Sequence, residues 1–470
     1  MSNNISIVWF RQDLRLHDNP ALHLAAQHGR ILPLYILDDN AAAEASMGEA
    51  SRVWLHHSLN ALDQRLNHEL SLFRGDPLAI LLRLCQENAI QHVFWNRSYE
   101  PWQIKRDTHI KRVLTEHGIT VKSSNGFLLW EPGLITKADG THYKVFTPFY
   151  QRGCLQATPP RHPLDTITPQ ASKLASSLRL SQLALLPNNH WHQALMAQHT
   201  AGENAALKAL DDFLDQRLPH YQDKRDFPSE QATSCLSAHL HFGELSINHA
   251  WHRAQQHRDQ KNAHAFCRQL AWREFSYNQL YHHPNLATQN QRPRFDLFPW
   301  QDNDSHFKAW CQGRTGIPLV DAGMRQLWQT GLMHNRVRMV TASFLCKNLL
   351  IDWRRGERWF RQCLVDADLA NNSAGWQWVA GCGADAAPYF RIFNPVLQGQ
   401  RFDPTGEYVR HFVPELRDLP DRYCHCPWEA PNAIQKAAAL TLGQDYPHPI
   451  VDLKASRERA LAAYRNLPES

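Results

Sequence analysis

The first 121 residues alternate short runs of β-branched and aromatic residues with stretches that have helical spacing. Such alternation is typical of a parallel sheet, because parallel neighbours need a long crossover connection, usually a helix. The runs predict strands at residues 5–10, 31–37, 70–73, 92–95 and 119–121, and helices at 50–67, 77–88 and 101–117. We therefore expect an N-terminal α/β domain built on a doubly wound parallel sheet.

The rest of the chain changes character twice. A length of 470 residues exceeds what one ordinary core accommodates, so we expect several domains. Residues 1–130 form the α/β domain, and the aperiodic residues 131–201 predict an interdomain linker. Residues 202–470 have helical spacing nearly throughout and predict a larger all-α domain. No G-x-G-x-x-G sequence follows the first strand, so the usual dinucleotide fingerprint is absent.

Charge and cysteine content favour a cytoplasmic protein. The 50 Lys and Arg residues against 45 Asp and Glu give a net charge of +5, which is compatible with a polyanionic partner. The ten cysteines are scattered, and Cys424 with Cys426 lacks the second pair that a structural zinc site needs. We expect reduced thiols, no metal, no secretion signal and no membrane span.

Residues 366–378 place two carboxylates, a carboxamide and two indoles within one short stretch: Asp366, Ala367, Asp368, Asn372, Trp376 and Trp378. Charged groups among apolar neighbours are costly unless a partner compensates them. Fixed polar groups beside easily oxidised indoles favour a redox cofactor over ordinary packing.

Two further stretches carry polar groups at helical positions. The hydroxyls of the Thr-Ser-Cys-Leu-Ser sequence at 233–237 precede a helical run, which suits a diphosphate; a plain N-cap is the alternative. At 266–277, Gln269, Trp272 and Arg273 fall near one helix face, and Glu274 can serve as an ion-pair partner. The alternative there is an aromatic stripe in the core.

Taken together, these motifs resemble the photolyase/cryptochrome family. The similar sequences are Trp-Phe-Arg-Gln-Asp-Leu-Arg-Leu-His-Asp-Asn at 9–19, Tyr-Lys-Val-Phe-Thr-Pro-Phe at 143–149, Thr-Ser-x-Leu-Ser at 233–237, Trp-Arg-Glu-Phe at 272–275, Met-His-Asn-Arg-x-Arg-Met at 333–339 and Asp-x-Asp-Leu-Ala-x-Asn at 366–372. The resemblance runs from about residue 5 to 465 and is strongest to bacterial class I cyclobutane pyrimidine dimer photolyases.

The resemblance implies that FAD binds in the helical domain. The matching positions are Tyr221, Thr233, Ser234, Cys235, Leu236, Ser237, Phe266, Arg273, Arg338, Asp366, Ala367, Asp368 and Asn372. Residues 233–237 would hold the diphosphate, and Asn372 would lie at flavin N5. Trp376, Trp353 and Trp300 match the family's electron-transfer chain; without the resemblance, Trp353 and Trp300 would be assigned to the core.

The implied activity is a lyase reaction on UV-damaged DNA, in which light drives an electron from reduced FAD to a flipped-out cyclobutane dimer. The matching lesion residues are Gln269, Trp272, Asn335, Met339 and Trp378, and the candidate phosphate contacts are Arg225, Arg336, Arg391 and Arg401. Binding to single- or double-stranded DNA would be independent of sequence, because backbone contacts carry no base information. A monomer is expected.

Two departures from the family pattern leave alternatives open. Gln269 replaces the usual Glu and resembles (6-4) photolyases, whereas Met-His-Asn-Arg at 333–336 is the cyclobutane type. Cyclobutane repair is therefore the first hypothesis, with (6-4) repair and a cryptochrome photoreceptor as alternatives. Trp102 and Gln103 replace the Asn-Glu pair of folate-binding relatives, so a second antenna chromophore would be methenyltetrahydrofolate or a deazaflavin, or the site would be empty.

Overall fold

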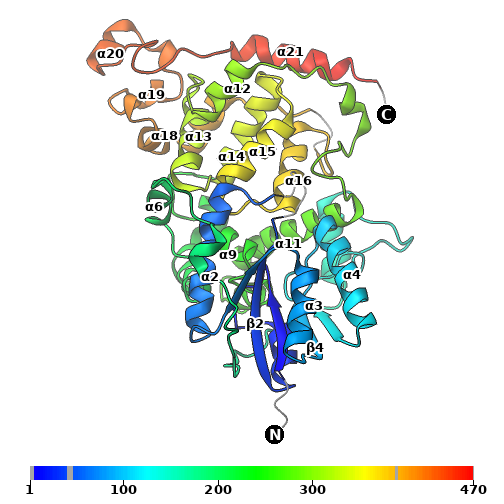
Figure 1. Ribbon diagram of the computed structural model, residues 1–470. Coiled ribbons are helices and arrows are strands. Elements are labelled where there is room, and N and C mark those ends of the chain that lie inside the picture. The colour runs from blue at the N-terminus through cyan, green and yellow to red at the C-terminus, as the bar shows by residue number, and fades with distance from the viewer. Residues whose placement is uncertain (1–4, 40–45, 387–389, 469–470) are drawn as a thin grey trace. The chain divides into compact units, whose positions relative to one another are not determined.

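The computed structural model describes residues 5–39, 46–386 and 390–468, which belong to two compact units (Figure 1). Unit 1 comprises Met1–Pro219, Ser234–Pro284 and Val365–Ala370, and unit 2 comprises His220–Thr233, Asn285–Leu364 and Asn371–Ser470. The domain and linker limits at 130/131 and 201/202 stay predictions.

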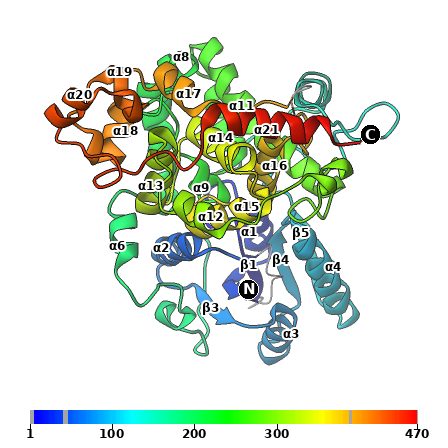
Figure 2. The ribbon, with the colours of Figure 1, turned by 90° about the horizontal axis from the view of Figure 1, so that it is seen from above.

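Unit 1 contains a five-stranded parallel sheet (Figure 2). Its strands are β1 Ile5–Phe10, β2 Arg30–Leu37, β3 Ser71–Arg74, β4 His92–Asn96 and β5 Thr120–Ser124. The order β3-β2-β1-β4-β5 reverses direction after β3, as in a doubly wound fold. All five predicted strands are present with small shifts at their ends, and every pair is parallel.

Helices cover both faces of this sheet. They are α1 Pro20–Ala26, α2 Glu49–Arg65, α3 Pro77–Glu87 and α4 Pro101–Glu116. Ile7 and Trp9 point to the face where Leu81 of α3 and Ile110 of α4 complete the core. Helix α1 contacts β1, β2, β4 and β5. The doubly wound α/β prediction is confirmed; α1, which the periodicity did not reveal, begins at an Asn-Pro cap that is a recognisable start signal.

The rest of unit 1 is helical or irregular. Its elements are α5 Phe146–Pro148, η2 Phe149–Gly153, η3 Cys154–Gln156, η4 Leu180–Leu183, α6 Trp191–Met196, α7 Glu203–Asp212, η5 Phe213–Arg217, η6 Leu218–His220, α9 Ser237–His241, α10 Ile247–Gln255 and α11 Gln260–His282. The long helix α11 is buried all round over residues 273–280 and carries the predicted Gln269, Trp272 and Arg273.

Unit 2 consists of helices packed on a core that includes Trp310, Phe344 and Trp353. Its elements are α8 Tyr221–Lys224, η7 Pro293–Leu297, α12 Asp304–Cys311, α13 Pro318–Thr330, α14 Asn335–Ser343, η8 Phe344–Asn348, α15 Trp353–Cys363, α16 Leu369–Ala380, α17 Pro395–Phe402, α18 Glu407–Phe412, η9 Pro414–Leu416, α19 Asp421–Cys424, η10 Pro427–Glu429, α20 Asn432–Ala437 and α21 Leu453–Arg465. Among the described residues no strand follows β5, which confirms the all-α prediction. Nor does any described helix combine the length and apolarity needed to cross a membrane.

A buried arginine fixes the loop after β1. Arg15 is only 1% exposed, and its guanidinium donates to the carbonyls of His17 (3.0 Å), Asp18 (2.9 Å), Gly126 (2.6 Å) and Gly243 (2.8 Å). Because a buried charge needs all its donors satisfied, these backbone segments are held together in unit 1.

Replacing Arg15 by Met should destabilise the protein by about 3–5 kcal/mol, because four buried carbonyls lose their donor. Urea unfolding followed by tryptophan fluorescence would measure this loss. Arg112→Met is a matched control: this arginine is 60% exposed in an i,i+4 pair, and its loss should cost less than about 0.5 kcal/mol. Equal stability of the two variants would contradict the role of Arg15.

Candidate functional site

Trp272 on α11 is a supported indole in unit 1. Its ring centroid lies 3.7 Å from that of Phe146 at an interplanar angle of 8°, so one face is covered. The ring of Phe275 meets it edge-on at 5.7 Å. Trp272 nevertheless remains half-buried, not fully buried. An indole fixed in this way can stack on a nucleobase at little entropic cost.

Arg273, the next residue of α11, is held in a fixed orientation. Its guanidinium donates to the carbonyl of Phe127 (3.1 Å) and to the carboxylate of Glu274 (3.1 Å). Glu274 also accepts from the backbone N–H of Leu129 at 2.8 Å. Burial raises the pKa of Glu274 to about 7, although Arg273 and the N–H donors act in the opposite direction. The expected ion pair between Arg273 and Glu274 is present.

Asp366 and Asp368 are buried in unit 1 beside two groups that the sequence analysis missed. Burial raises the pKa of Glu100 to about 7; the indole N–H of Trp102 at 2.7 Å opposes this shift, and the charge of Asp368 adds to it. Burial lowers the pKa of His241, while Asp368 and Asp366 raise it. His241 Nδ1 is a buried polar atom without a hydrogen-bond partner among the described residues. Only the tertiary fold reveals these neighbours, since Glu100 is far away in sequence.

The 233–237 segment differs from a plain helix cap. Helix α9 begins at Ser237 without any side-chain cap hydrogen bond. Cys235 has a φ of +56°, a left-handed conformation that costs energy in a non-glycine residue. Ser234 is half-buried, and Ser237 is exposed. The N-cap alternative is therefore wrong for these hydroxyls, and diphosphate binding stays a prediction.

Asn372 on α16 has a defined amide orientation in unit 2. Its Nδ2 donates to the Glu357 carboxylate at 2.8 Å and to the Glu357 carbonyl at 3.1 Å. Both partners can only accept, so the amide nitrogen must face them. Glu357 is buried and lies 3.3 Å from Arg361. The Asn372 Oδ1 atom is consequently the part of the side chain that can accept a hydrogen bond from a ligand.

Trp376, four residues further along α16, is buried among aromatic rings. Its ring centroid is 4.9 Å from Phe360 and 6.1 Å from Trp310, an indole that the sequence analysis did not select. A Cβ added at Gly356 would lie 2.2 Å from the Trp376 ring, so this glycine makes room for the indole.

The other two indoles of the predicted chain have different surroundings. Trp353 is fully buried at the start of α15, and its Nε1 donates to Asn290 at 2.9 Å. Trp300 is half-buried, with its ring centroid 4.5 Å from that of Phe298. Burial thus decreases from Trp353 to Trp300, as a chain that ends at the surface requires, but the electron-transfer role stays a prediction.

Three of the four arginines predicted to contact phosphate gather in unit 2. The guanidinium of Arg336 lies 4.3 Å over the ring of Phe402, and that of Arg401 lies 5.1 Å from the same ring. Arg336 is paired with Asp226 at 2.7 Å, and Arg225 is 4.0 Å from this carboxylate. A cluster of guanidiniums of this kind suits a polyanion.

Trp378 and Arg391 share a neighbour. The ring centroid of Phe393 lies 6.4 Å from Trp378, and the Arg391 guanidinium lies 5.9 Å from the Phe393 ring. The Trp378 Nε1 donates to the carbonyl of Asp385 at 3.1 Å. The indole is therefore held at both its ring and its nitrogen.

The remaining predicted residues are described individually. Tyr221 and Leu236 are buried, and the Arg225 guanidinium lies 5.2 Å over the Tyr221 ring. The ring centroid of Phe266 is 4.7 Å from that of Phe213, and Gln269 is half-buried. Asn335 is exposed, with its Nδ2 3.9 Å from the sulfur of Met339, and Arg338 donates to the carbonyl of Met333 at 2.8 Å.

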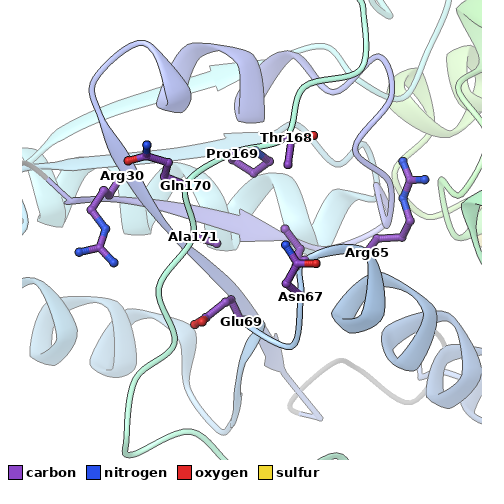
Figure 3. A pocket seen from close by; sticks show the side chains of 9 residues that line it. Arg30, Arg65, Asn67, Glu69, Thr168, Pro169, Gln170 and Ala171 are labelled. Carbon is purple, nitrogen blue, oxygen red and sulfur yellow. The ribbon is translucent and has the colours of Figure 1, made fainter.

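Two further groups of polar residues lie in unit 1, and a second chromophore stays a prediction. The carboxyl ends of β1 and β4, where the strand order reverses, are filled by Arg11, which binds Asp107 and the carbonyl of Asn96. Gln103 is buried near there on α4. A separate hollow of about 440 Å³ is lined by Arg30, Arg65, Asn67, Glu69 and residues 168–171, none of which was predicted (Figure 3).

Comparison with known proteins places this arrangement in a family. Residues 6–170 match the family model described as DNA photolyase, and residues 266–466 match the FAD binding domain of DNA photolyase. The deoxyribodipyrimidine photo-lyase of Agrobacterium fabrum is 48% identical over 469 residues, 97% of each chain. Cryptochrome-1 of Arabidopsis thaliana is 37% identical over 97% of this chain and 70% of its own. A bacterial class III photolyase structure from Agrobacterium tumefaciens matches with a TM-score of 0.94 at 47% identity, covering 99% of this chain and 98% of its own.

These likenesses define a flavoprotein enzyme of the photo-lyase type with FAD as its cofactor. The chain belongs to the DNA photolyase/cryptochrome family. The fold, cofactor and enzyme predictions are confirmed at this level. The motifs resembled class I enzymes, whereas the similar solved structure is a class III photolyase, so the subclass belongs to the proposal below.

Glu100→Gln should make the protein more stable at pH 8 by about 1–3 kcal/mol. The pKa of Glu100 is raised from 4.5 to about 7, so the folded state keeps a proton that the unfolded chain loses in this range. The contribution of Glu100 therefore lowers the free energy of unfolding as pH rises from 4.5 to 7. The Glu100→Gln variant lacks this decrease.

Unfolding at pH 5, 6, 7 and 8 would test this, with Glu116→Gln as a control because Glu116 is 55% exposed. The expected advantage of Glu100→Gln grows with pH and levels off above 7. A difference from wild type that stays the same at every pH would show that Glu100 does not titrate in this window.

Proposed function

We propose that this chain uses light to repair UV-damaged DNA by splitting cyclobutane pyrimidine dimers. The observation that carries the proposal is Trp272, an indole backed at 3.7 Å by Phe146 yet not fully buried. A flipped-out pyrimidine dimer loses its stacking in the duplex, and a rigid aromatic side chain compensates that loss. The class III photolyase at 47% identity favours class III over class I for this chain.

The residues present fit FAD. His241 Nδ1 is buried with no hydrogen-bond partner in the described part of the chain, α9 begins without a side-chain cap, and Asn372 directs an acceptor oxygen away from Glu357. We propose that Asn372 Oδ1 accepts a hydrogen bond from the flavin and that residues 233–237 bind the diphosphate. When bound, FAD supplies the light-excited electron that opens the dimer.

A neutral side chain at position 372 has an electrostatic reason. Glu357 is already a buried acid beside it, and a second carboxylate would oppose any negative charge on a reduced cofactor. The amide binds Glu357 through its nitrogen without adding charge. This favours a repair enzyme over a cryptochrome in which Asp takes this place.

DNA would be held chiefly through its phosphates. The group around Phe402 brings Arg225, Arg336 and Arg401 together, and such contacts anchor a strand without reading its sequence. We keep Arg391 as a fourth contact, and we propose that the enzyme acts as a monomer in the cytoplasm.

His334 supports cyclobutane repair over (6-4) repair. Its Nδ1 accepts from the backbone N–H of Arg336 at 3.2 Å, and its Nε2 donates to the carbonyl of Arg225 at 3.0 Å. Burial lowers its pKa to about 4, so the ring is neutral and both nitrogens are committed to α14 and its neighbour. Its neighbours in the sequence are Met333 and Asn335, whereas (6-4) enzymes typically have a His-His pair in this motif. Gln269 remains the feature that favours the (6-4) alternative.

Illumination of the protein with DNA that contains only cyclobutane dimers should restore the pyrimidines, and DNA that contains only (6-4) products should stay unchanged. Restored bases would be counted by chromatography after equal light doses, with a dark reaction as control. Repair of only the (6-4) substrate would establish the alternative, and repair of neither would favour a photoreceptor.

Trp376→Phe should strongly slow photoreduction of the bound FAD, because phenylalanine is much harder to oxidise, while dimer repair by chemically pre-reduced protein stays near wild type. Trp310→Phe is the matched control, since Trp310 is also fully buried and lies 6.1 Å from Trp376 but is outside the predicted chain. Flavin absorbance under blue light measures photoreduction in both variants, and chromatography of the restored bases measures their repair. Equal loss of photoreduction and repair would contradict the role of Trp376.

A further inference from the structure

Lys347 in η8 is a buried cation that the function described above does not use. It is 1% exposed, and its Nζ lies 3.1 Å from the centroid of the Phe390 ring. An ammonium in an apolar environment is costly unless something compensates its charge. The face of an aromatic ring provides that compensation, and a desolvated contact of this kind is strong.

Phe390 begins a segment that is fixed at both of its ends. Its ring stacks on Tyr464 with centroids 4.6 Å apart at an angle of 8°. At the other end, the backbone N–H of Phe393 donates to Ser343 Oγ at 3.2 Å, and the Phe393 ring lies 6.4 Å from Trp378. Residues 390–393 therefore connect the lysine contact to Trp378 and carry Arg391 between them.

The space at this contact is too small for a ligand. Lys347, Trp378, Phe390, Arg391 and Phe393 line one hollow of about 20 Å³, which has room for roughly one water molecule. An anion that neutralises the lysine would not fit without rearrangement. The Phe390 ring therefore compensates the ammonium charge, and Lys347 in turn fixes the position of residues 390–393.

We propose that Lys347 is a positioning residue for lesion binding: its ammonium holds Phe390, and through residues 390–393 it sets the placement of Arg391 and Trp378. This inference rests on the proposed function, since it assigns to Trp378 and Arg391 their roles toward damaged DNA. Lys347 itself touches no DNA in this scheme.

The charge of Lys347 gives the proposal a distinctive pH dependence. Burial lowers its pKa to about 7, so the ammonium is present at pH 6 and largely lost at pH 8.5. The neighbouring thiols stay protonated, because burial raises the pKa of Cys382 to about 12 and that of Cys346 well above its usual range. The guanidinium groups of Arg292 and Arg391 line the same hollow.

Tyr464 is a further ionisable residue against this cluster. It stacks on Phe390, and its hydroxyl accepts from Arg294 at 2.7 Å. Tyr464 and Lys347 line the same hollow, and a variant that lacks only the lysine charge separates the contributions of the two groups.

The test compares wild type, Lys347→Met, Lys347→Arg and the exposed control Lys454→Met. Dissociation constants would be measured in the dark, at constant ionic strength and at pH 6 and 8.5, for a duplex with one cyclobutane dimer and for its undamaged copy. We expect Lys347→Met to weaken binding of the damaged duplex about tenfold at pH 6 and far less at pH 8.5. Lys347→Arg should stay near wild type at pH 6 and exceed it at pH 8.5, while binding of the undamaged duplex changes little.

Hydrogen exchange of the 390–393 amides gives a readout that does not need DNA. Faster exchange in Lys347→Met at pH 6, with unchanged FAD content, is expected. If that variant fails to fold, the protection factors of the wild-type amides at pH 6 and 8.5, corrected for the intrinsic exchange rate at each pH, give the comparison, with lower protection expected at pH 8.5. Unchanged exchange, or a binding difference that is independent of pH, would overturn the role of Lys347 alone. Absence of any preference of the wild type for damaged DNA would overturn the proposed function as well.

Discussion

The guanidinium of Arg15 is the interaction on which the arrangement of unit 1 depends. A charge that is 1% exposed has no water to stabilise it, so it must find acceptors in the backbone, and it finds four of them. Two of these acceptors, Gly126 and Gly243, lie far from Arg15 in the sequence. The loop after β1 is therefore fixed against two segments that come much later in the chain, and Phe127, next to one acceptor, in turn supports Arg273.

Buried ionic groups at the candidate site are likewise fixed by short-range partners. Arg273 is paired with Glu274 in unit 1, and Glu357 binds both Arg361 and Asn372 in unit 2. Removing one partner of such a pair leaves an uncompensated charge, so each side chain has one favourable orientation. The consequence is a preorganised set of polar groups, which costs no rearrangement when a ligand binds.

The sequence was sufficient for those features that repeat along the chain or match a family motif. Strands buried on both faces have continuous apolar runs, so β1 to β4 could be predicted within a few residues. Strand β5 lies at the sheet edge and is fully buried only at Val121, and the run predicted at 119–121 overlaps just its beginning. The motifs identified Trp272, Asn372 and Trp376. It was insufficient for neighbours that only the tertiary fold creates. Glu100 lies beside Asp368, Trp310 beside Trp376, and Lys347 beside Phe390, and no spacing in the chain predicts these contacts. The short helix α1 has too few turns for a periodic signal, although Asn19 caps it.

Neutral polar side chains at key positions have a common physical basis. Asn372 and Gln269 are amides, and His334 is held neutral by burial. A cofactor that changes its charge during a reaction would repel a fixed ion in one of its states, whereas a fixed dipole penalises neither state strongly. Amides also keep their donors and acceptors at every pH. The pH sensitivity of this protein should therefore come from other buried groups, such as Glu100 and Lys347, and not from the amides and the histidine that would contact the cofactor or the lesion.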